Sequence, residues 1–215
     1  KIVDLHIGLV RDFCRLQSGS AATISNKISF LRAALNEAFE DRMVNVNVVK
    51  NWTFKKESTD IIEEDKISPF SLDEETKILN SFEHEQTRNC YELSFWSGLR
   101  PSEIIALTWE DIDFENSIIK VRRSKTQYSK DVQKTKTKGS RRDVRMLDRA
   151  RSVLKAQRKH TLLGNSTVFI NEETGLSWND SSELRVPWCE ALKIAGLAYR
   201  KPYITRHTYA SRMLI

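Results

Sequence analysis

The chain has 215 residues, of which 40% are hydrophobic and 30% charged, and its net charge is +6. This composition is typical of a globular domain, and no apolar run approaches the ~20 residues that a membrane-spanning helix needs. Three widely spaced cysteines without a CxxC pair argue against a disulfide framework and a zinc site, and for a reducing cytoplasm.

Two helices are predicted in the N-terminal part. The first covers 4–17 and ends at Ser18-Gly19-Ser20. Thr23 is expected to cap the second, whose apolar stripe consists of Ile24, Ile28, Leu31, Leu35 and Ala38. A polar, mostly acidic linker follows, which predicts a helical domain over 1–56, a linker over 57–68 and a second domain over 69–215.

Three helices are predicted directly after the linker. Ser71 and Glu74 form a capping-box pattern for a helix that ends near Phe82. A second helix covers 90–97 and is broken by Gly98. A short third helix starts at Pro101, because proline is well tolerated in the first helical position.

The remaining pattern predicts a small antiparallel sheet and further helices. A turn is expected over 111–116 and strands over 118–123, 131–137 and 143–146. Helices are expected over 148–159, with Asp148 as the cap, over 180–195 and from Pro202 onward. Pro187 either kinks its helix or marks the true start. The fold class is therefore mainly α with a three-stranded antiparallel sheet (α+β).

Positive charge is concentrated in residues 120–151, which carry a local charge of +10, while the rest of the chain is net −4. Such a patch is typical of a site for a polyanion, with nucleic acid as the first candidate. A solvated basic hairpin is the alternative.

Arg100 is predicted to project from the rigid start of the short helix at Pro101. A fixed guanidinium at a helix start suits a phosphate. The alternative is a simple ion pair with Glu103.

Three blocks in this order carry a family resemblance: Gly98-Leu99-Arg100-Pro101-Ser102-Glu103, then 134–142, then Tyr203-Ile204-Thr205-Arg206-His207-Thr208. Together they resemble the catalytic domain of the tyrosine recombinases, the phage-integrase family, from about residue 70 to 215. The resemblance implies an integrase-type catalytic domain, preceded here by part of a helical, SAM-like core-binding domain that we expect to be truncated upstream.

The resemblance also implies the chemistry. A tyrosine hydroxyl attacks a DNA phosphodiester and forms a 3′-phosphotyrosine, so no cofactor or metal is needed. Arg100 and Arg206 match the two phosphate-binding arginines, and Lys136 matches the lysine that protonates the leaving oxygen, with Lys138 as its rival. Tyr203 stands where the family usually has a histidine, and a phenol is a poor base at neutral pH.

Supporting roles are expected for Glu103, as an orienting group or an ordinary surface carboxylate, and for His207. Contacts with the DNA backbone are expected from Arg122, Arg123, Lys125, Lys134, Arg141 and Arg142. The chain stops nine residues after Arg206, before the position where the family has its nucleophile, so we expect it to bind DNA without cleaving it.

Double-stranded attachment-site DNA is the expected partner, with a tetramer on DNA for the full-length enzyme and a monomer for this chain alone. The expected location is the cytoplasm of a bacterial or phage-infected cell. A DNA-binding regulator that lacks catalysis is the alternative function, and a protein that binds RNA or another acidic partner is a third.

Overall fold

The computed structural model describes residues 4–55, 68–125, 133–134, 141–164 and 166–214. The chain divides into two compact units, Lys1–Glu64 and Asp65–Ile215, which are treated separately here. Among the described residues, no helix combines the length and apolar character that a membrane span requires.

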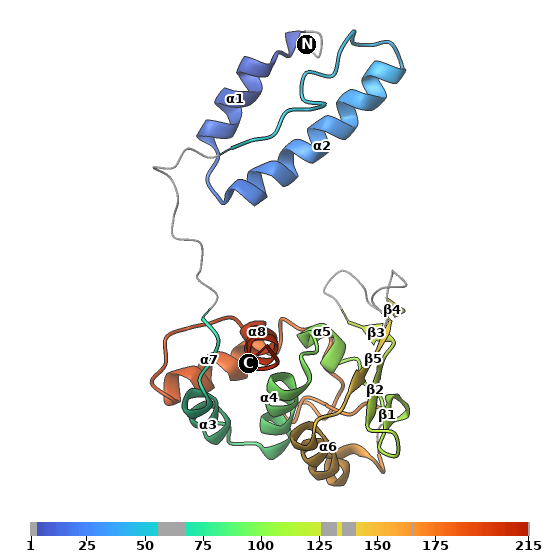
Figure 1. Ribbon diagram of the computed structural model, residues 1–215, viewed down its shortest axis with the longest axis vertical. Helices are drawn as coiled ribbons and strands as arrows, with labels where there is room; N and C mark the ends of the chain where they lie inside the picture. The colour runs from blue at the N-terminus through green and yellow to red at the C-terminus, as the bar shows by residue number, and fades with distance from the viewer. Residues whose placement is uncertain (1–3, 56–67, 126–132, 135–140, 165, 215) are drawn as a thin grey trace. The chain divides into compact units, whose positions relative to one another are not determined.

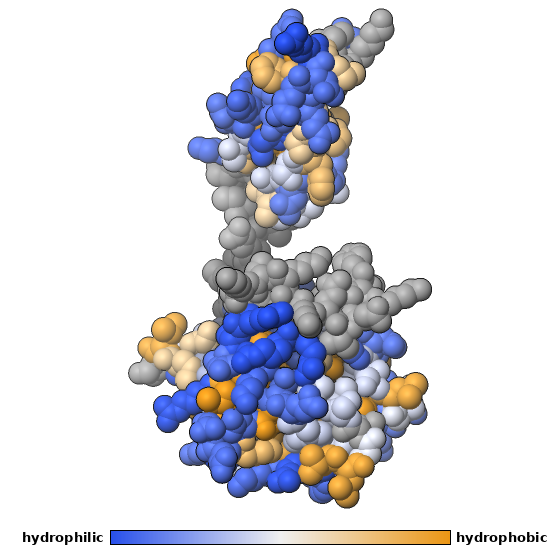
Figure 2. Space-filling model, turned by 90° about the vertical axis from the view of Figure 1, so that its right-hand side faces the viewer, coloured by the Kyte–Doolittle hydropathy of each residue, from blue (hydrophilic) through white to orange (hydrophobic). Residues whose placement is uncertain are grey.

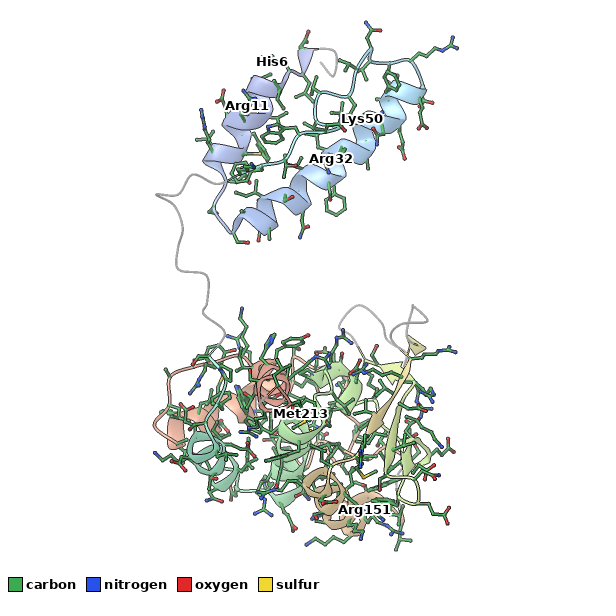
Figure 3. All side chains as sticks on the ribbon, in the orientation of Figure 1. His6, Arg11, Arg32, Lys50, Arg151 and Met213 are labelled. Carbon is green, nitrogen blue, oxygen red and sulfur yellow. The ribbon has the colours of Figure 1, made fainter. Side chains whose placement is uncertain are left out.

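The first unit consists of helices α1 (Ile7–Leu16) and α2 (Ala21–Glu40) and a segment that returns along them (Figure 1). Its small core includes Val10, Cys14, Ile28 and Val49. Arg32, labelled in Figure 3, donates hydrogen bonds to the carbonyls of Val49 at 3.0 Å and Trp52 at 2.9 Å. This arginine therefore fastens the returning segment to α2.

Two details of this unit differ from the sequence prediction. Ser20, not Thr23, caps α2, because the Ser20 hydroxyl accepts a hydrogen bond from the Thr23 N–H at 3.2 Å. In α1 the buried residues are Val10 and Cys14, whereas the predicted apolar spacing includes residues that are half or more exposed, such as Leu16. Apolar patches accordingly interrupt the hydrophilic surface of this unit in Figure 2.

The second unit is built around helix α4 (Glu85–Ser97), which packs against α3 (Leu72–Asn80), α5 (Pro101–Ile104), α6 (Asp148–Thr161) and α8 (Ile204–Arg212) (Figure 1). Leu93 and Phe95 of α4 are fully buried. Helix α7 (Arg185–Ile194) packs on α3. Because α4 touches both α5 and α8, it sets the position of the two motifs that carry Arg100 and Arg206.

The helix predictions for this unit are confirmed, with shifted ends. Helix α4 starts five residues earlier than predicted, at Glu85. Pro187 lies in the first turn of α7, so it marks the start of that helix and does not kink it. Leu147 is the residue that precedes α6, and Asp148 is its first helical residue, so Asp148 is not the cap.

The sheet has three antiparallel strands, as predicted, but one member differs. Strands β1 (Ile112–Asp113), β2 (Ile118–Val121) and β5 (Arg142–Arg145) form it in the order β1-β2-β5. Strand β4 (Gln133–Lys134), expected as the third member, pairs instead with β3 (Arg123–Ser124) in a separate ribbon. The segment 111–116, expected as a turn only, supplies the 3₁₀ turn η3 (Trp109–Asp111) and then β1.

Aromatic side chains form the centre of the second unit. Trp188 of α7 is fully buried against Tyr91, Phe95 and Phe70, with ring centroids 5.1 to 6.2 Å away. Its indole N–H donates to the Arg200 carbonyl at 2.6 Å. This one side chain therefore joins α4, α7 and the segment that leads into α8.

Replacing Trp188 with alanine should lower the free energy of unfolding of this unit by about 3–5 kcal/mol, because a buried aromatic leaves a cavity that its neighbours fill only partly. Val186 lies on the same helix and is 64% exposed, so V186A is the matched control and should change stability by less than ~0.5 kcal/mol. Urea denaturation followed by circular dichroism measures both. Equal losses for the two variants would contradict this description of the core.

Candidate active site

Arg100 lies immediately before α5, and its own sequence fixes its backbone. Pro101 occupies the first helical position, and the Glu103 carboxylate accepts a hydrogen bond from the Arg100 backbone N–H at 2.8 Å. Leu99 and Ile104 are buried on either side of it. The Arg100 side chain, 44% exposed, therefore projects toward solvent from a rigid point.

Glu103 is only 2% exposed and holds two guanidinium groups. Its carboxylate accepts from Arg100 Nη1 at 2.9 Å and from both Nη atoms of Arg142 at 2.8 Å each. Burial, the largest influence, raises the pKa of this carboxyl, but hydrogen bonds from Arg142 and Arg100 outweigh it and the pKa lies below its ordinary value. Glu103 thus links α5 to β5 and is not a surface carboxylate.

Arg206 lies in the first turn of α8 and reaches the turn that precedes Arg100. Its Nη1 donates a hydrogen bond to the Gly98 carbonyl. Gly98 ends α4 with a φ of 61°, a left-handed conformation that favours glycine. A Cβ atom at Gly98 would lie 2.4 Å from Cδ1 of Tyr209, which is also on α8. Glycine is therefore needed here both for the backbone turn and for the close approach of α8.

Tyr203 lies at the start of α8, three residues before Arg206, and next to Arg100. The pKa of the Arg100 guanidinium lies above its ordinary value, chiefly because it donates a hydrogen bond to the Glu103 carboxylate and to a lesser extent because of the neighbouring Tyr203 phenol. The His207 ring packs edge-on against Tyr203, with ring centroids 5.3 Å apart. The histidine thus contacts the phenol, in line with the supporting role predicted for it.

Two guanidinium groups and one phenol therefore meet where the start of α8 faces the turn between α4 and α5. Arginine forks donate parallel hydrogen bonds to phosphate oxygens and remain charged at any physiological pH. A phenol adds one more donor. The structure brings the segment with Arg100 and Glu103 close to the segment with Tyr203 and Arg206, although Arg100 and Arg206 are 106 positions apart in the sequence. That one phosphate group binds both arginines stays a prediction.

Two basic residues predicted as DNA contacts have partners inside the protein. Arg122 donates to the Arg142 carbonyl at 3.0 Å and to the Asp143 carboxylate at 2.5 Å. Arg123 pairs with the nearly buried Asp111 carboxylate at 2.5 Å. These contacts, like the pairing of Arg142 with Glu103, stabilise the strands. Sequence reasoning missed this structural role, and a direct DNA contact by these residues stays a prediction.

Lys125, which the sequence suggested only as a DNA contact, lies next to the Arg100 motif. Its backbone N–H donates to the Ser102 carbonyl, and its Nζ donates to the Trp178 carbonyl, both at 2.9 Å. Burial lowers the pKa of this amine, and the nearby Glu183 only partly opposes the shift. A lysine with a lowered pKa beside α5 is suited to proton transfer. Nothing local in the sequence signals its contact with residue 178.

Lys136 and Lys138, the predicted proton donors, lie outside the described residues, so the choice between them stays open. Lys134 falls in strand β4, where its backbone pairs with Arg123. Arg141 is exposed at the start of the segment that leads into β5. Among the predicted DNA contacts whose side-chain burial the structure describes, Arg141 is the one that is exposed.

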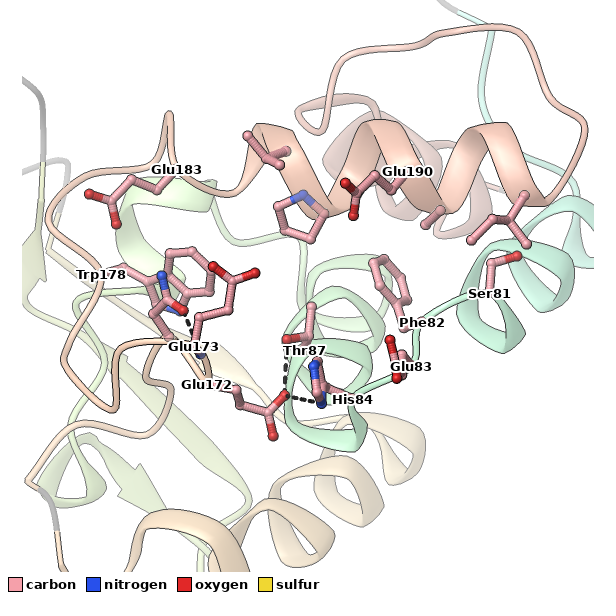
Figure 4. A pocket seen from close by; sticks show the side chains of 15 residues that line it. Ser81, Phe82, Glu83, His84, Thr87, Glu172, Glu173, Trp178, Glu183 and Glu190 are labelled. Carbon is pink, nitrogen blue, oxygen red and sulfur yellow. Dashed lines mark hydrogen bonds and ion pairs between the residues drawn. The ribbon is translucent and has the colours of Figure 1, made fainter.

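A separate pocket of about 390 Å³ lies between the start of α4, α7 and the segment around residues 171–178 (Figure 4). His84 Nδ1 lies 3.8 Å from Glu172 Oε2 at its edge. Its other carboxylates belong to Glu83, Glu173, Glu183 and Glu190. Five carboxylates repel a phosphate group, so this pocket is distinct from the arginine site.

Comparison with known proteins identifies the family. A family model described as "Phage integrase family" matches residues 70–215. The chain belongs to the phage integrase family. The prophage integrase IntR of Escherichia coli (strain K12) is 29% identical over 89% of this chain and 50% of its own length. The chain thus spans about half the length of the curated relatives it matches.

Solved structures of integrases have the same fold. The Tn1549 transposon integrase, in complex with a circular intermediate DNA, superposes with a TM-score of 0.76 at 19% identity, over 99% of this chain and 74% of that chain. A lambda integrase tetramer bound to a Holliday junction gives 0.72 at 19% identity, over 97% of this chain and 60% of that chain. The mainly helical fold with a small antiparallel sheet is therefore that of the tyrosine recombinase catalytic domains.

Substituting Gly98 with alanine should lower the free energy of unfolding by about 1–2 kcal/mol for the left-handed backbone and by a further ~1–3 kcal/mol for the overpacked contact with Tyr209. Gly175 has a similar φ of 68° but open space where a Cβ would lie. G175A is therefore the matched control and should show the backbone effect alone. Urea denaturation measures both, and equal losses would contradict the close approach of α8 to Gly98.

Replacing Glu103 with glutamine should destabilise the fold by about 3 kcal/mol near neutral pH, because two guanidinium groups lose a buried counter-ion. The folded-state pKa of Glu103 is lowered, so its contribution is complete above the unfolded pKa of ~4.3 and is lost as pH falls through the folded value. The stability gap between wild type and E103Q should therefore narrow below about pH 4. The exposed Glu110 supplies the control variant E110Q, and a gap constant from pH 7 to 3 would contradict the role of Glu103.

Proposed function

We propose that this chain belongs to a site-specific DNA recombinase of a phage or mobile element, and that it binds duplex DNA and activates one phosphodiester for strand exchange. The observation that carries the proposal is the meeting of Arg100, Tyr203 and Arg206 around Gly98. Membership of the phage integrase family supports it. Related integrases solved with DNA support the choice of substrate.

In this proposal Arg100 and Arg206 bind the non-bridging oxygens of the scissile phosphate. Negative charge grows on these oxygens as a nucleophile attacks in line, and the two guanidinium groups are already fixed before the reaction begins. Glu103 orients Arg100 through its 2.9 Å contact. The nucleophile is a tyrosine of the complete protein, which forms a 3′-phosphotyrosine and releases a 5′-hydroxyl, so the bond energy is retained for religation.

Tyr203 acts as a hydrogen-bond donor to the phosphate and not as a base. A phenol is a hydrogen-bond donor and a poor base at neutral pH. It therefore stabilises the charged transition state but does not accept the proton of the attacking hydroxyl. Its contact with Arg100 supports this assignment.

A lysine protonates the departing 5′ oxygen. Lys136 is the assignment from the sequence, with Lys138 as its rival, and the structure adds Lys125 as a third candidate. Lys125 is joined to Ser102 of α5, and burial lowers its pKa. A lysine with a lowered pKa suits proton donation, and in the protein without DNA its Nζ donates to the Trp178 carbonyl.

We assign residues 1–56, which lie within unit Lys1–Glu64, to the core-binding domain, residues 57–68 to the linker and residues 69–215 to the catalytic domain. The complete protein acts as a tetramer on two duplexes in the cytoplasm of a bacterial or phage-infected cell. One related integrase has been solved as a tetramer on a Holliday junction. This chain by itself is proposed to be a monomer that binds DNA without forming a covalent adduct.

Arg206→Ala in the complete protein should reduce covalent adduct formation on a nicked suicide substrate by about 10²–10³-fold, the usual effect of losing one preorganised donor. Duplex binding should change little, since other basic residues contribute to it. Arg185, which lies on α7 and stacks on Tyr199, provides the control variant R185A. If the wild-type protein binds DNA but forms no covalent adduct, the alternative of a regulator without catalysis is favoured.

The three lysines can be separated with a substrate whose 5′ bridging oxygen is replaced by sulfur, because a thiolate leaves without needing a proton. Alanine replacement of the proton donor should slow cleavage of ordinary DNA and should be rescued on the sulfur substrate. K125A, K136A and K138A are compared side by side for adduct formation. A variant that is equally slow on both substrates is not the proton donor.

A further inference from the structure

The first turn of α3 carries two consecutive glutamates, Glu74 and Glu75, that the proposed chemistry does not use. Glu75 is only 3% exposed. A buried carboxylate is rare unless a positive partner is close by. In both cases that partner is an arginine at one end of α8, the helix that carries Arg206.

Glu75 holds the last residue of α8. Its Oε2 lies 2.5 Å from Nη1 of Arg212, and its Oε1 accepts a hydrogen bond from the Trp96 indole N–H at 2.6 Å. The Arg212 guanidinium lies over the Trp96 ring, 5.1 Å from its centroid. No described residue accepts an aligned hydrogen bond from the Nη atoms of Arg212, so charge and stacking hold this buried group.

Glu74 holds the segment that leads into α8. Its carboxylate pairs with Arg200, and the hydrogen bond from that arginine is the main reason why the pKa of Glu74 lies below its ordinary value. The Arg200 guanidinium also lies over the Phe70 ring, 3.8 Å from its centroid. Phe70, two residues before α3, and Glu74 in its first turn therefore fix Arg200 in the segment that leads into α8.

Contacts between these two ends fix the middle of α8. The Phe70 N–H donates to the Thr208 hydroxyl at 3.0 Å, and the Thr205 and Ser94 hydroxyls share a hydrogen bond of 2.5 Å. Thr205 and Thr208 are fully buried. Arg206 lies between them in sequence, is partly buried and contacts the Gly98 carbonyl at the end of α4. Its direction is therefore set by how α8 is seated on α3 and α4.

We propose that Glu75 is a positioning residue for Arg206: by clamping Arg212 against Trp96 it fixes the seat of α8, and Glu74 completes the clamp through Arg200. The importance of this clamp for catalysis rests on the function proposed above. The effect of the clamp on the position of the Arg206 side chain is independent of that function, because Arg206 contacts Gly98 in the protein without DNA.

The chain offers a matched control. Glu92, on α4, pairs with Arg149 at 2.5 Å, and Arg149 lies over the same Trp96 ring, 5.9 Å from its centroid. Arg149 belongs to α6, which carries none of the proposed active-site residues. Glu92→Gln therefore removes an ion pair beside the same indole without releasing α8, although Arg149 is more exposed than Arg212, at 56% against 17%.

The test follows the Arg206 Nε–H signal by nuclear magnetic resonance in this chain, with the signal assigned from Arg206→Lys. Glu75→Gln should raise its hydrogen-exchange rate by about five-fold or more, the lower end of typical coupling between sites. E92Q should leave it unchanged. If E75Q does not fold, Arg212→Lys, which keeps the charge but loses the flat stacking, is measured instead and should give a smaller increase.

The clamp would be contradicted if the hydrogen-exchange rate of Arg206 were unchanged in E75Q or R212K, or if it rose equally in E92Q. In the complete protein, E75Q should slow adduct formation and leave DNA affinity within about two-fold, and it should have no further effect once Arg206 is already lysine. If the wild-type protein forms no adduct while E75Q still raises the hydrogen-exchange rate of Arg206, the clamp stands and the proposed function fails. The two outcomes are thus distinguishable.

Discussion

The candidate site depends on one contact, the approach of α8 to the turn at Gly98. The Arg206 guanidinium donates to the Gly98 carbonyl, and the Tyr209 ring fills the space where any larger residue at position 98 would place its Cβ. This contact brings the two arginine motifs together although 105 residues separate them. Without it, Arg100 and Arg206 would be unrelated surface charges.

The rest of the second unit supports this contact from several sides. Helix α4 ends at Gly98 and touches α3, α6 and α8, and the buried Trp188 holds the segment before α8 through the Arg200 carbonyl. Glu103 joins Arg100 to strand β5 through Arg142. Glu103 thus pairs with Arg142 and orients Arg100. The guanidinium groups of Arg100 and Arg206 and the Tyr203 phenol remain as the groups that could bind an anion.

The sequence predicted most of the elements and the family correctly, because helical periodicity, the Ser71 capping box and the motifs at Arg100 and Arg206 are local signals. It could not predict contacts made across the fold. The pairing of Arg142 with Glu103 and the position of Lys125 beside Ser102 depend on which strands pair, and strand β1 replaced the expected third strand. For the same reason, basic residues that suggested a DNA surface, such as Arg123, are partly committed to internal ion pairs.

A crystal structure of this chain bound to duplex DNA tests the central claim most directly. The account predicts that the guanidinium groups of Arg100 and Arg206 lie within hydrogen-bond distance of the non-bridging oxygens of one and the same phosphate, with the Tyr203 hydroxyl as a further donor. Contacts of the two arginines with different phosphates, or DNA bound on another face of the protein, would contradict it.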